Sequence, residues 1–157
     1  MKIETLQPLL AVHPFFAGLD PEHLTIITGC AHNTRFGADQ SIFAEGDPAN
    51  SFYLIRSGRI ALDVSIPGRG HHVVQTVEEG DVLGWSWLFP PHEWMFSARA
   101  VEPTRAVAMN GTCLREKCEA DPALGYELMK RFAAVMVERL HATRIQLLDV
   151  YGDKRNQ

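Results

Sequence analysis

Short segments rich in Ile, Val, Phe and Tyr, each closed by a glycine turn, fill the middle of the chain from about Asn33 onward. Glycine tolerates the positive φ angles of tight turns, so a glycine between two apolar segments is typical of a reversal between strands. The turns are Glu45-Gly46-Asp47, Ser57-Gly58, Pro67-Gly68-Arg69-Gly70 and Glu79-Gly80-Asp81. Short strands at this regular spacing predict an antiparallel barrel or sandwich.

The clearest predicted strand runs from Arg59 to Ile66. Apolar and polar positions alternate along it, as expected when one face of a sheet is buried and the other meets water. The predicted inward residues are Ile60, Leu62, Val64 and Ile66, and the predicted outward residues are Arg59, Ala61, Asp63 and Ser65.

Helices are predicted on both sides of the strands. Asp20-Pro21 and Asp121-Pro122 each combine a residue that can cap free backbone amides with a proline suited to the first helical turn. We therefore expect one domain over 1–157, with a helical lead-in over 1–32 and a β-barrel over 33–110. A short helix over 111–120 and a long helix over 121–151 complete this mainly β fold with flanking helices.

The long helix carries two apolar stripes. The first stops at Arg139, so we expect it to pack on the strands for only the first turns. Its members are Leu124, Leu128, Phe132 and Val135. The second has the alternating four- and three-residue steps of a coiled-coil seam and predicts a homodimer through a partner helix. Its members are Met129, Ala133, Met136, Leu140, Thr143, Leu147 and Val150.

Length, charge and cysteine content limit the functions open to the chain. Its 157 residues carry a net charge of -4, without the basic excess that nucleic-acid binders use to neutralise phosphates. No apolar run suits a signal peptide or a membrane span, so we expect a cytoplasmic protein with no nucleic-acid or membrane partner. The three cysteines, Cys30, Cys113 and Cys118, include no close pair and are interpreted as reduced thiols.

Three segments near the glycine turns form a specific set. They are Phe43-Ala44-Glu45-Gly46-Asp47-Pro48-Ala49, Phe52-Tyr53-Leu54-Ile55-Arg56-Ser57-Gly58 and Gly80-Asp81-Val82-Leu83-Gly84. This set resembles the sensor domain of the Crp/Fnr regulators and other cyclic-nucleotide-binding domains. The resemblance implies a jelly-roll β-barrel followed by a dimerisation helix. Family transcription factors continue into a winged helix-turn-helix, whereas this sequence ends at Gln157, so we expect a stand-alone sensor without a DNA-binding domain.

The resemblance also places a phosphate-binding cassette from Gly84 through Ser86 and Trp87 toward the next strand. In nucleotide-binding members, the residue after the glycine is a glutamate that binds the ribose, and an arginine followed by serine or threonine binds the cyclic phosphate. Those positions correspond to Trp85, Met95 and Phe96 here. Because a buried phosphate needs a cationic hydrogen-bond partner, we do not expect ordinary cyclic AMP binding.

Two further residues are candidate ligand contacts. Arg99 lies four residues beyond Met95, and four strand residues span roughly 13 Å, so it reaches the same phosphate only through a bulge or a shifted register. The alternative interpretation is that Arg99 is a surface arginine on the strand exterior. Thr143 aligns with a helix position from which family members contact the purine, and its alternative is a polar seam residue bonded to its own helix.

The aromatic cluster in the cassette has two open interpretations. Trp85, Trp87, Trp94 and Phe96 either line a cavity for an apolar or aromatic effector or fill the former nucleotide site. The first makes the chain a small-molecule sensor or regulatory module with an unidentified downstream partner. The second makes it a ligand-free dimerisation or protein-interaction module, and a true cyclic-nucleotide-binding signalling domain is the remaining alternative.

Catalysis and resident cofactors are not expected. None of the seven histidines has a recognised metal-binding spacing, and the adjacent His71 and His72 would point to opposite faces of a strand. No strained nucleophile turn or glycine-rich phosphate loop is present. A haem sensor with His92 or Cys113 as axial ligand is the least favoured alternative.

Overall fold

The computed structural model describes the backbone of residues 3–155 and the side chains of residues 6–149. Its strands form two four-stranded antiparallel sheets with the orders β1-β8-β3-β6 and β2-β7-β4-β5. The first sheet contains β1 (Ala31–Phe36), β3 (Ser51–Ser57), β6 (Val82–Leu83) and β8 (Thr104–Asn110). The second contains β2 (Ser41–Phe43), β4 (Arg59–Ile66), β5 (Gly70–Glu78) and β7 (Ser97–Ala100). The mainly β prediction is confirmed, although the described strands leave the barrel open between the two sheets.

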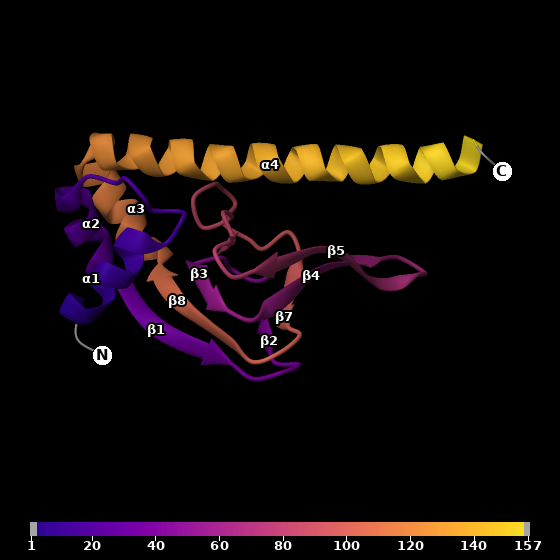
Figure 1. Ribbon diagram of the computed structural model, residues 1–157, viewed down its shortest axis with the longest axis horizontal. Helices are drawn as coiled ribbons and strands as arrows, with labels where there is room; N and C mark the ends of the chain where they lie inside the picture. The colour runs from indigo at the N-terminus through magenta and orange to yellow at the C-terminus, as the bar shows by residue number, and fades with distance from the viewer. Residues whose placement is uncertain (1–2, 156–157) are drawn as a thin grey trace.

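The alternation predicted along β4 holds only in its first half. Ile60 and Leu62 are fully buried as expected, but Ala61 is also buried, Val64 is only partly covered and Ile66 is exposed. The physical reason is that β4 pairs with β7 only from Ile60 to Asp63, whereas its end pairs with β5 alone. The tip of this hairpin therefore extends beyond the sheet into solvent (Figure 1).

Four helices flank the sheets: α1 (Ile3–Val12), α2 (Pro21–Thr28), α3 (Gly111–Ala120) and α4 (Pro122–Arg155). The predicted cap of α2 is confirmed, because the Asp20 side chain accepts a hydrogen bond from the Glu22 backbone amide at 2.8 Å. Figure 1 shows α1, α2 and α3 gathered beside the first half of α4, which runs as a straight rod along one edge of the molecule. None of the described helices is both long enough and apolar enough to span a bilayer.

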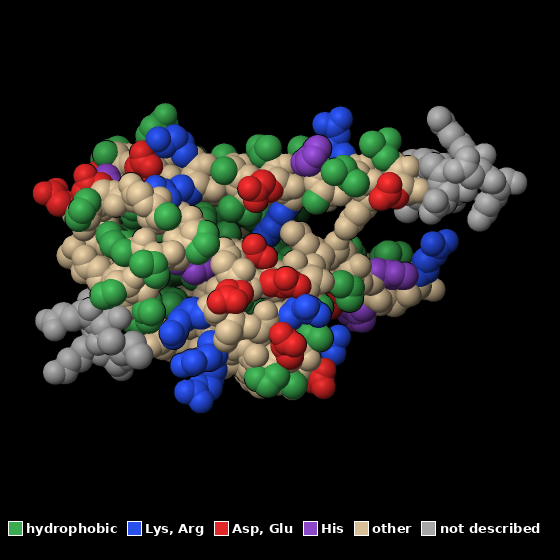
Figure 2. Space-filling model, in the orientation of Figure 1, with side chains coloured by type: hydrophobic (Ala, Val, Ile, Leu, Met, Phe, Trp, Pro, Cys, Tyr) green, Lys and Arg blue, Asp and Glu red, His purple; other side chains and the backbone are tan. Residues whose placement is uncertain are grey.

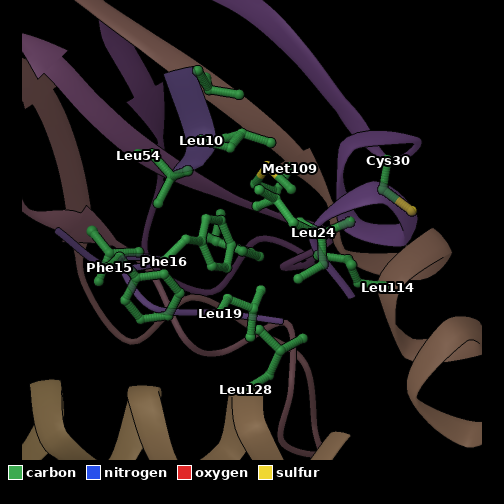
Figure 3. Packing of buried hydrophobic residues seen from close by; sticks show 14 of the residues in the cluster. Leu10, Phe15, Phe16, Leu19, Leu24, Cys30, Leu54, Met109, Leu114 and Leu128 are labelled. Carbon is green, nitrogen blue, oxygen red and sulfur yellow. The ribbon is translucent and has the colours of Figure 1, made fainter. Parts of the chain in front are cut away.

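The inner stripe of α4 packs as predicted. Leu124, Leu128 and Phe132 are fully buried, and Val135 lies partly buried against the same cluster. Phe15 and Phe52 meet the ring of Phe132 edge-on, with centroids 4.7 and 5.2 Å away. Figure 3 shows this core filling the space between α4, the lead-in helices and the first sheet.

The interpretation of the cysteines as reduced thiols is wrong for two of them, because Cys30 and Cys113 form a disulfide. Because the two cysteines are 83 residues apart, their pairing could not be predicted from the sequence. Pairing of β1 with β8 brings the end of α2 to the start of α3, where the Asn110 amide donates to the Cys30 carbonyl at 2.8 Å. Cys118 remains free, and burial raises the pKa of its thiol.

The outer stripe of α4 stays uncovered in the single chain. Met129, Leu140 and Leu147 are 43%, 63% and 52% exposed, and Figure 2 shows hydrophobic side chains recurring along this helix. Ala133 and Thr143 are also exposed, Met136 is partly covered, and the side chain of Val150 lies outside the described residues. The predicted dimer seam therefore remains a prediction.

Candidate functional site

The predicted cassette begins at Gly84, which follows β6 and has a φ of +96°. A Cβ atom at this position would lie 2.6 Å from the Trp94 ring, so both the backbone angle and the space require glycine. The Trp94 ring stacks on Phe43 of β2, with centroids 3.7 Å apart and planes only 6° from parallel. Trp94 thus fixes the far end of the cassette against the second sheet.

The loop between β2 and β3 is bonded to the cassette through its backbone. Gly46 donates to the Trp94 carbonyl at 2.8 Å, Trp94 donates to the Asp47 carbonyl at 2.9 Å, and Ala49 donates to the His92 carbonyl at 2.7 Å. Pro48 and Glu93 add an antiparallel bridge between the same segments. These contacts bring the side chains of residues distant in sequence to one opening.

That opening is a cleft of about 620 Å³ between the cassette and α4, hereafter the cassette cleft. Most of its lining is apolar, and Met136 reaches it from α4. The lining residues are Glu45, Gly46, Trp85, Ser86, Phe89, Pro90, Pro91, Glu93, Trp94, Met95 and Met136. Trp85, Ser86, Trp94 and Met95 were predicted from the sequence, whereas Glu45, Glu93 and Met136 were not expected as ligand contacts.

The tryptophans of the cassette divide between core and cleft. Trp87 is completely buried, stacks on Phe52 at 5.0 Å between centroids and belongs to the core under α4. Trp85 and Trp94 instead line the cassette cleft. Trp87 therefore fills space in the molecule, and the cavity interpretation applies to the other two rings.

Met95 and Phe96, which replace the arginine and the serine or threonine of nucleotide-binding members, lie in different surroundings. Met95 is 71% exposed and lies on the wall of the cassette cleft. Phe96 points toward the second sheet, where it contacts Phe43 at 5.9 Å and meets Trp85 edge-on at 6.4 Å between centroids. Apolar packing thus occupies the place at which the resemblance puts a hydroxyl for phosphate.

Arg99 and Thr143 lie away from this opening. Arg99 is on the outer face of β7, between the buried Ala98 and Ala100, and pairs with Asp39 at 3.2 Å. The hydroxyl of Thr143 is exposed and donates to the Arg139 carbonyl at 2.9 Å. In the single chain, Arg99 is therefore a surface arginine on the strand exterior, and Thr143 is hydrogen-bonded to its own helix.

Arg139 is the cassette contact that sequence reasoning missed. Its guanidinium lies over the Trp85 ring, 4.7 Å from the centroid, and donates to the Val82 carbonyl on the strand that enters the cassette. Burial lowers the pKa of this guanidinium from its ordinary value, and the nearby Asp81 and Glu138 carboxylates oppose that shift. The end of the inner stripe at Arg139 was its only sequence signal.

The described residues hold no cluster of three or more His, Cys, Asp or Glu side chains that could bind a metal ion. The sulfur of Cys113, weighed above as a haem ligand, is bonded to Cys30 and is not a thiolate. Among the described residues, the cassette cleft combines apolar walls with a few polar groups, the usual composition of a small-molecule site.

Comparison with known proteins agrees with this architecture. The profile of the cyclic nucleotide-binding domain matches residues 33–121, more than half of the chain. The chain belongs to the cyclic nucleotide-binding domain family. Its relatives include Crp-like regulators, and the resemblance drawn from the glycine turns is confirmed.

Particular relatives define the level of similarity. The CRP-like cAMP-activated global transcriptional regulator of Mycobacterium tuberculosis is 26% identical over 145 residues, 92% of this chain and 63% of the relative. The cyclic AMP receptor protein of Thermus thermophilus is 26% identical, over 92% of this chain and 65% of the relative. The chain thus spans less than two thirds of these relatives. A candidate cyclic nucleotide-binding protein from Geobacter metallireducens has a crystal structure with a TM-score of 0.77 and 35% identity, covering 90% of this chain and 99% of that one.

Proposed function

We propose that this chain is a small-molecule sensor of the Crp type whose cassette binds a largely apolar ligand in place of a cyclic nucleotide. The observation that carries this proposal is the cassette cleft, in which Trp85 and Met95 stand where the resemblance requires a ribose-binding carboxylate and a phosphate-binding guanidinium. A cavity of about 620 Å³ with aromatic walls suits a compact aromatic ligand.

The charges near the cleft argue against nucleotide binding. No Lys or Arg is among the described residues that line it, and Arg99 is already paired with Asp39 outside. A phosphate deprived of its charged hydrogen bond loses roughly 1.5 to 3 kcal/mol of stabilisation, about one to two factors of ten in affinity. Retained cyclic nucleotide binding is therefore the weaker alternative.

A ligand-free dimerisation module is a second candidate, favoured by one specific observation. Trp87 and Phe96 are packed against neighbouring rings, so part of the aromatic cluster fills space without any ligand. The two candidates share the homodimer along α4, a regulatory role without catalysis and a cytoplasmic location. They differ only in whether the cassette cleft is occupied.

A thermal-shift screen of the purified protein tests the proposal. Small aromatic compounds that bind the folded state should raise the melting temperature in proportion to the logarithm of their concentration. Cyclic AMP and cyclic GMP serve as the family comparison. A screen in which only the cyclic nucleotides shift the transition would overturn the proposal. Met95→Lys, which places a positive charge on an exposed wall position, should weaken the shift caused by a true cleft ligand.

A further inference from the structure

We propose that the cassette cleft selects organic cations, meaning aromatic or bulky apolar compounds that carry an ammonium group. This inference rests on the proposed function and adds the chemical class of the ligand. The formal charges among the described lining residues are two carboxylates, Glu45 and Glu93, and none of the other lining residues is basic. A cavity with this charge pattern attracts a cation and repels a phosphate or carboxylate.

The backbone holds the two carboxylates in place. Glu93 lies in the bridge with Pro48, and the hydrogen bonds from Gly46 and to Asp47 join the loop carrying Glu45 to the cassette. The Glu45 amide also donates to the Ser97 hydroxyl at 2.9 Å, and its Oε1 accepts from the Ser65 amide at 3.2 Å. The position of Glu45 at the cleft is thus set by contacts with three neighbouring segments: the cassette, β7 and β4.

Neither carboxylate is neutralised within the chain. The ion pairs of the described residues involve other acidic groups, and neither Glu45 nor Glu93 is among them. Both residues line the cleft and are exposed to solvent. The cleft therefore presents two uncompensated negative charges beside an apolar wall.

The aromatic wall strengthens the same preference. Indole and phenyl faces attract cations through their ring quadrupoles, and the thioethers of Met95 and Met136 add polarisable contacts. Arg139 already occupies one face of the Trp85 ring in this way, so a ligand cation would meet the remaining aromatic wall and the two thioethers. Its guanidinium lines the neighbouring cleft under α4, beside Asp81 and Glu138, and is not part of the cassette cleft.

Three naphthalene probes of matched shape separate charge from apolar fit. They are 1-naphthylmethylamine, which is cationic at pH 7, neutral 1-naphthylmethanol and anionic 1-naphthoate, each titrated into the whole chain by isothermal calorimetry. We expect the amine to bind at least about tenfold more tightly than the alcohol, and the carboxylate to bind most weakly. The readout is the ratio of dissociation constants.

Glutamine substitutions then assign the preference to residues. Glu45→Gln with Glu93→Gln should lower the amine-to-alcohol preference about tenfold, because it removes both charges while a glutamine oxygen can still accept the Ser65 bond. The matched control is Glu102→Gln with Glu116→Gln, two exposed residues outside the cleft, which should keep the preference. If the double variant is unstable, Glu93→Gln alone replaces it, because the Glu93 side chain makes no hydrogen bond among the described residues.

The outcomes distinguish the two proposals. Equal binding of amine and alcohol, tighter binding of the carboxylate, or a preference unaltered by the Glu45 and Glu93 substitutions would overturn the cation inference and leave the apolar cleft standing. Failure of all three probes to bind would remove the cleft as a ligand site, and the proposed function would fall with the inference.

Discussion

The guanidinium of Arg139 lies 4.7 Å from the centre of the Trp85 ring and connects α4 to the first residue of the cassette after Gly84. The same side chain donates to the Val82 carbonyl on β6, while its Nη1 atom is buried without a hydrogen-bond partner among the described residues. One side chain thus links the helix that carries the predicted dimer seam to the wall of the cassette cleft.

Arg139→Leu should destabilise the fold by about 1 to 3 kcal/mol, because it removes a charge-assisted bond to the Val82 carbonyl and the contact with Trp85. Urea denaturation measures the loss, and tryptophan emission reports the change around Trp85. The matched control is Arg144→Leu, since Arg144 is exposed on the same helix. Equal midpoints for the two variants would show that the Arg139 contact contributes no stability.

The exposed seam of α4 predicts a parallel homodimer. Leu140→Lys with Leu147→Lys should yield a monomer in sedimentation equilibrium, because lysines at seam positions place like charges opposite one another. Ile145→Lys is the control, since Ile145 is also exposed but lies roughly 150° around the helix from the seam. A double variant that still sediments as a dimer would exclude this seam.

Cyclic AMP and cyclic GMP should bind no more tightly than the millimolar range, a free energy of about -4 kcal/mol. Restoring the polar set through Trp85→Glu, Met95→Arg and Phe96→Ser should raise nucleotide affinity, measured by calorimetry on both proteins. Micromolar binding to the unmodified chain would instead show that the assignment of these three positions to ribose and phosphate contacts is wrong. The single change Met95→Gln adds no charge and should leave nucleotide affinity unchanged.

Loss of the Cys30–Cys113 disulfide should lower stability by about 2 to 5 kcal/mol, because the bond closes a long loop in the unfolded chain. Cys113→Ser and reductant treatment of the unmodified chain should have similar effects on the urea midpoint. Cys118→Ser is the control, since Cys118 is free and should change the midpoint little. A midpoint insensitive to reductant would contradict a stabilising disulfide.

His13 should make stability depend on pH. Burial lowers its pKa below the ordinary value of 6.5, opposed by a hydrogen bond between Nε2 and the Ile55 carbonyl and by the Asp81 charge. The unfolded chain then binds a proton at higher pH than the folded chain, so stability is lost as pH falls from 6.5 toward the folded-state pKa.

Urea midpoints between pH 7.5 and 5 measure this dependence. His13→Asn should flatten the decline, whereas the control His32→Asn, at an exposed position, should retain it. Parallel curves for the two variants would assign the pH response to other groups.

The chain's local patterns determined its class of fold. Glycine turns predicted the strands, Asp20 predicted the cap of α2, and the spacing of Leu124, Leu128 and Phe132 predicted the buried face of α4. These features are set by backbone preference and by solvent exclusion along one element, so neighbouring residues suffice to reveal them. The segments around the glycine turns also identified the family.

Tertiary structure alone decided the contents of the site. The Cys30–Cys113 bond and the contact of Arg139 with Trp85 join residues far apart in the sequence, and Glu45 and Glu93 line one cleft although 48 positions separate them. The division of Trp87 into the core and Trp85 into the cleft likewise depends on which neighbour fills the space beside each ring. Local periodicity places a side chain on a face, but packing between elements selects the atoms it meets, and that selection depends on the whole fold.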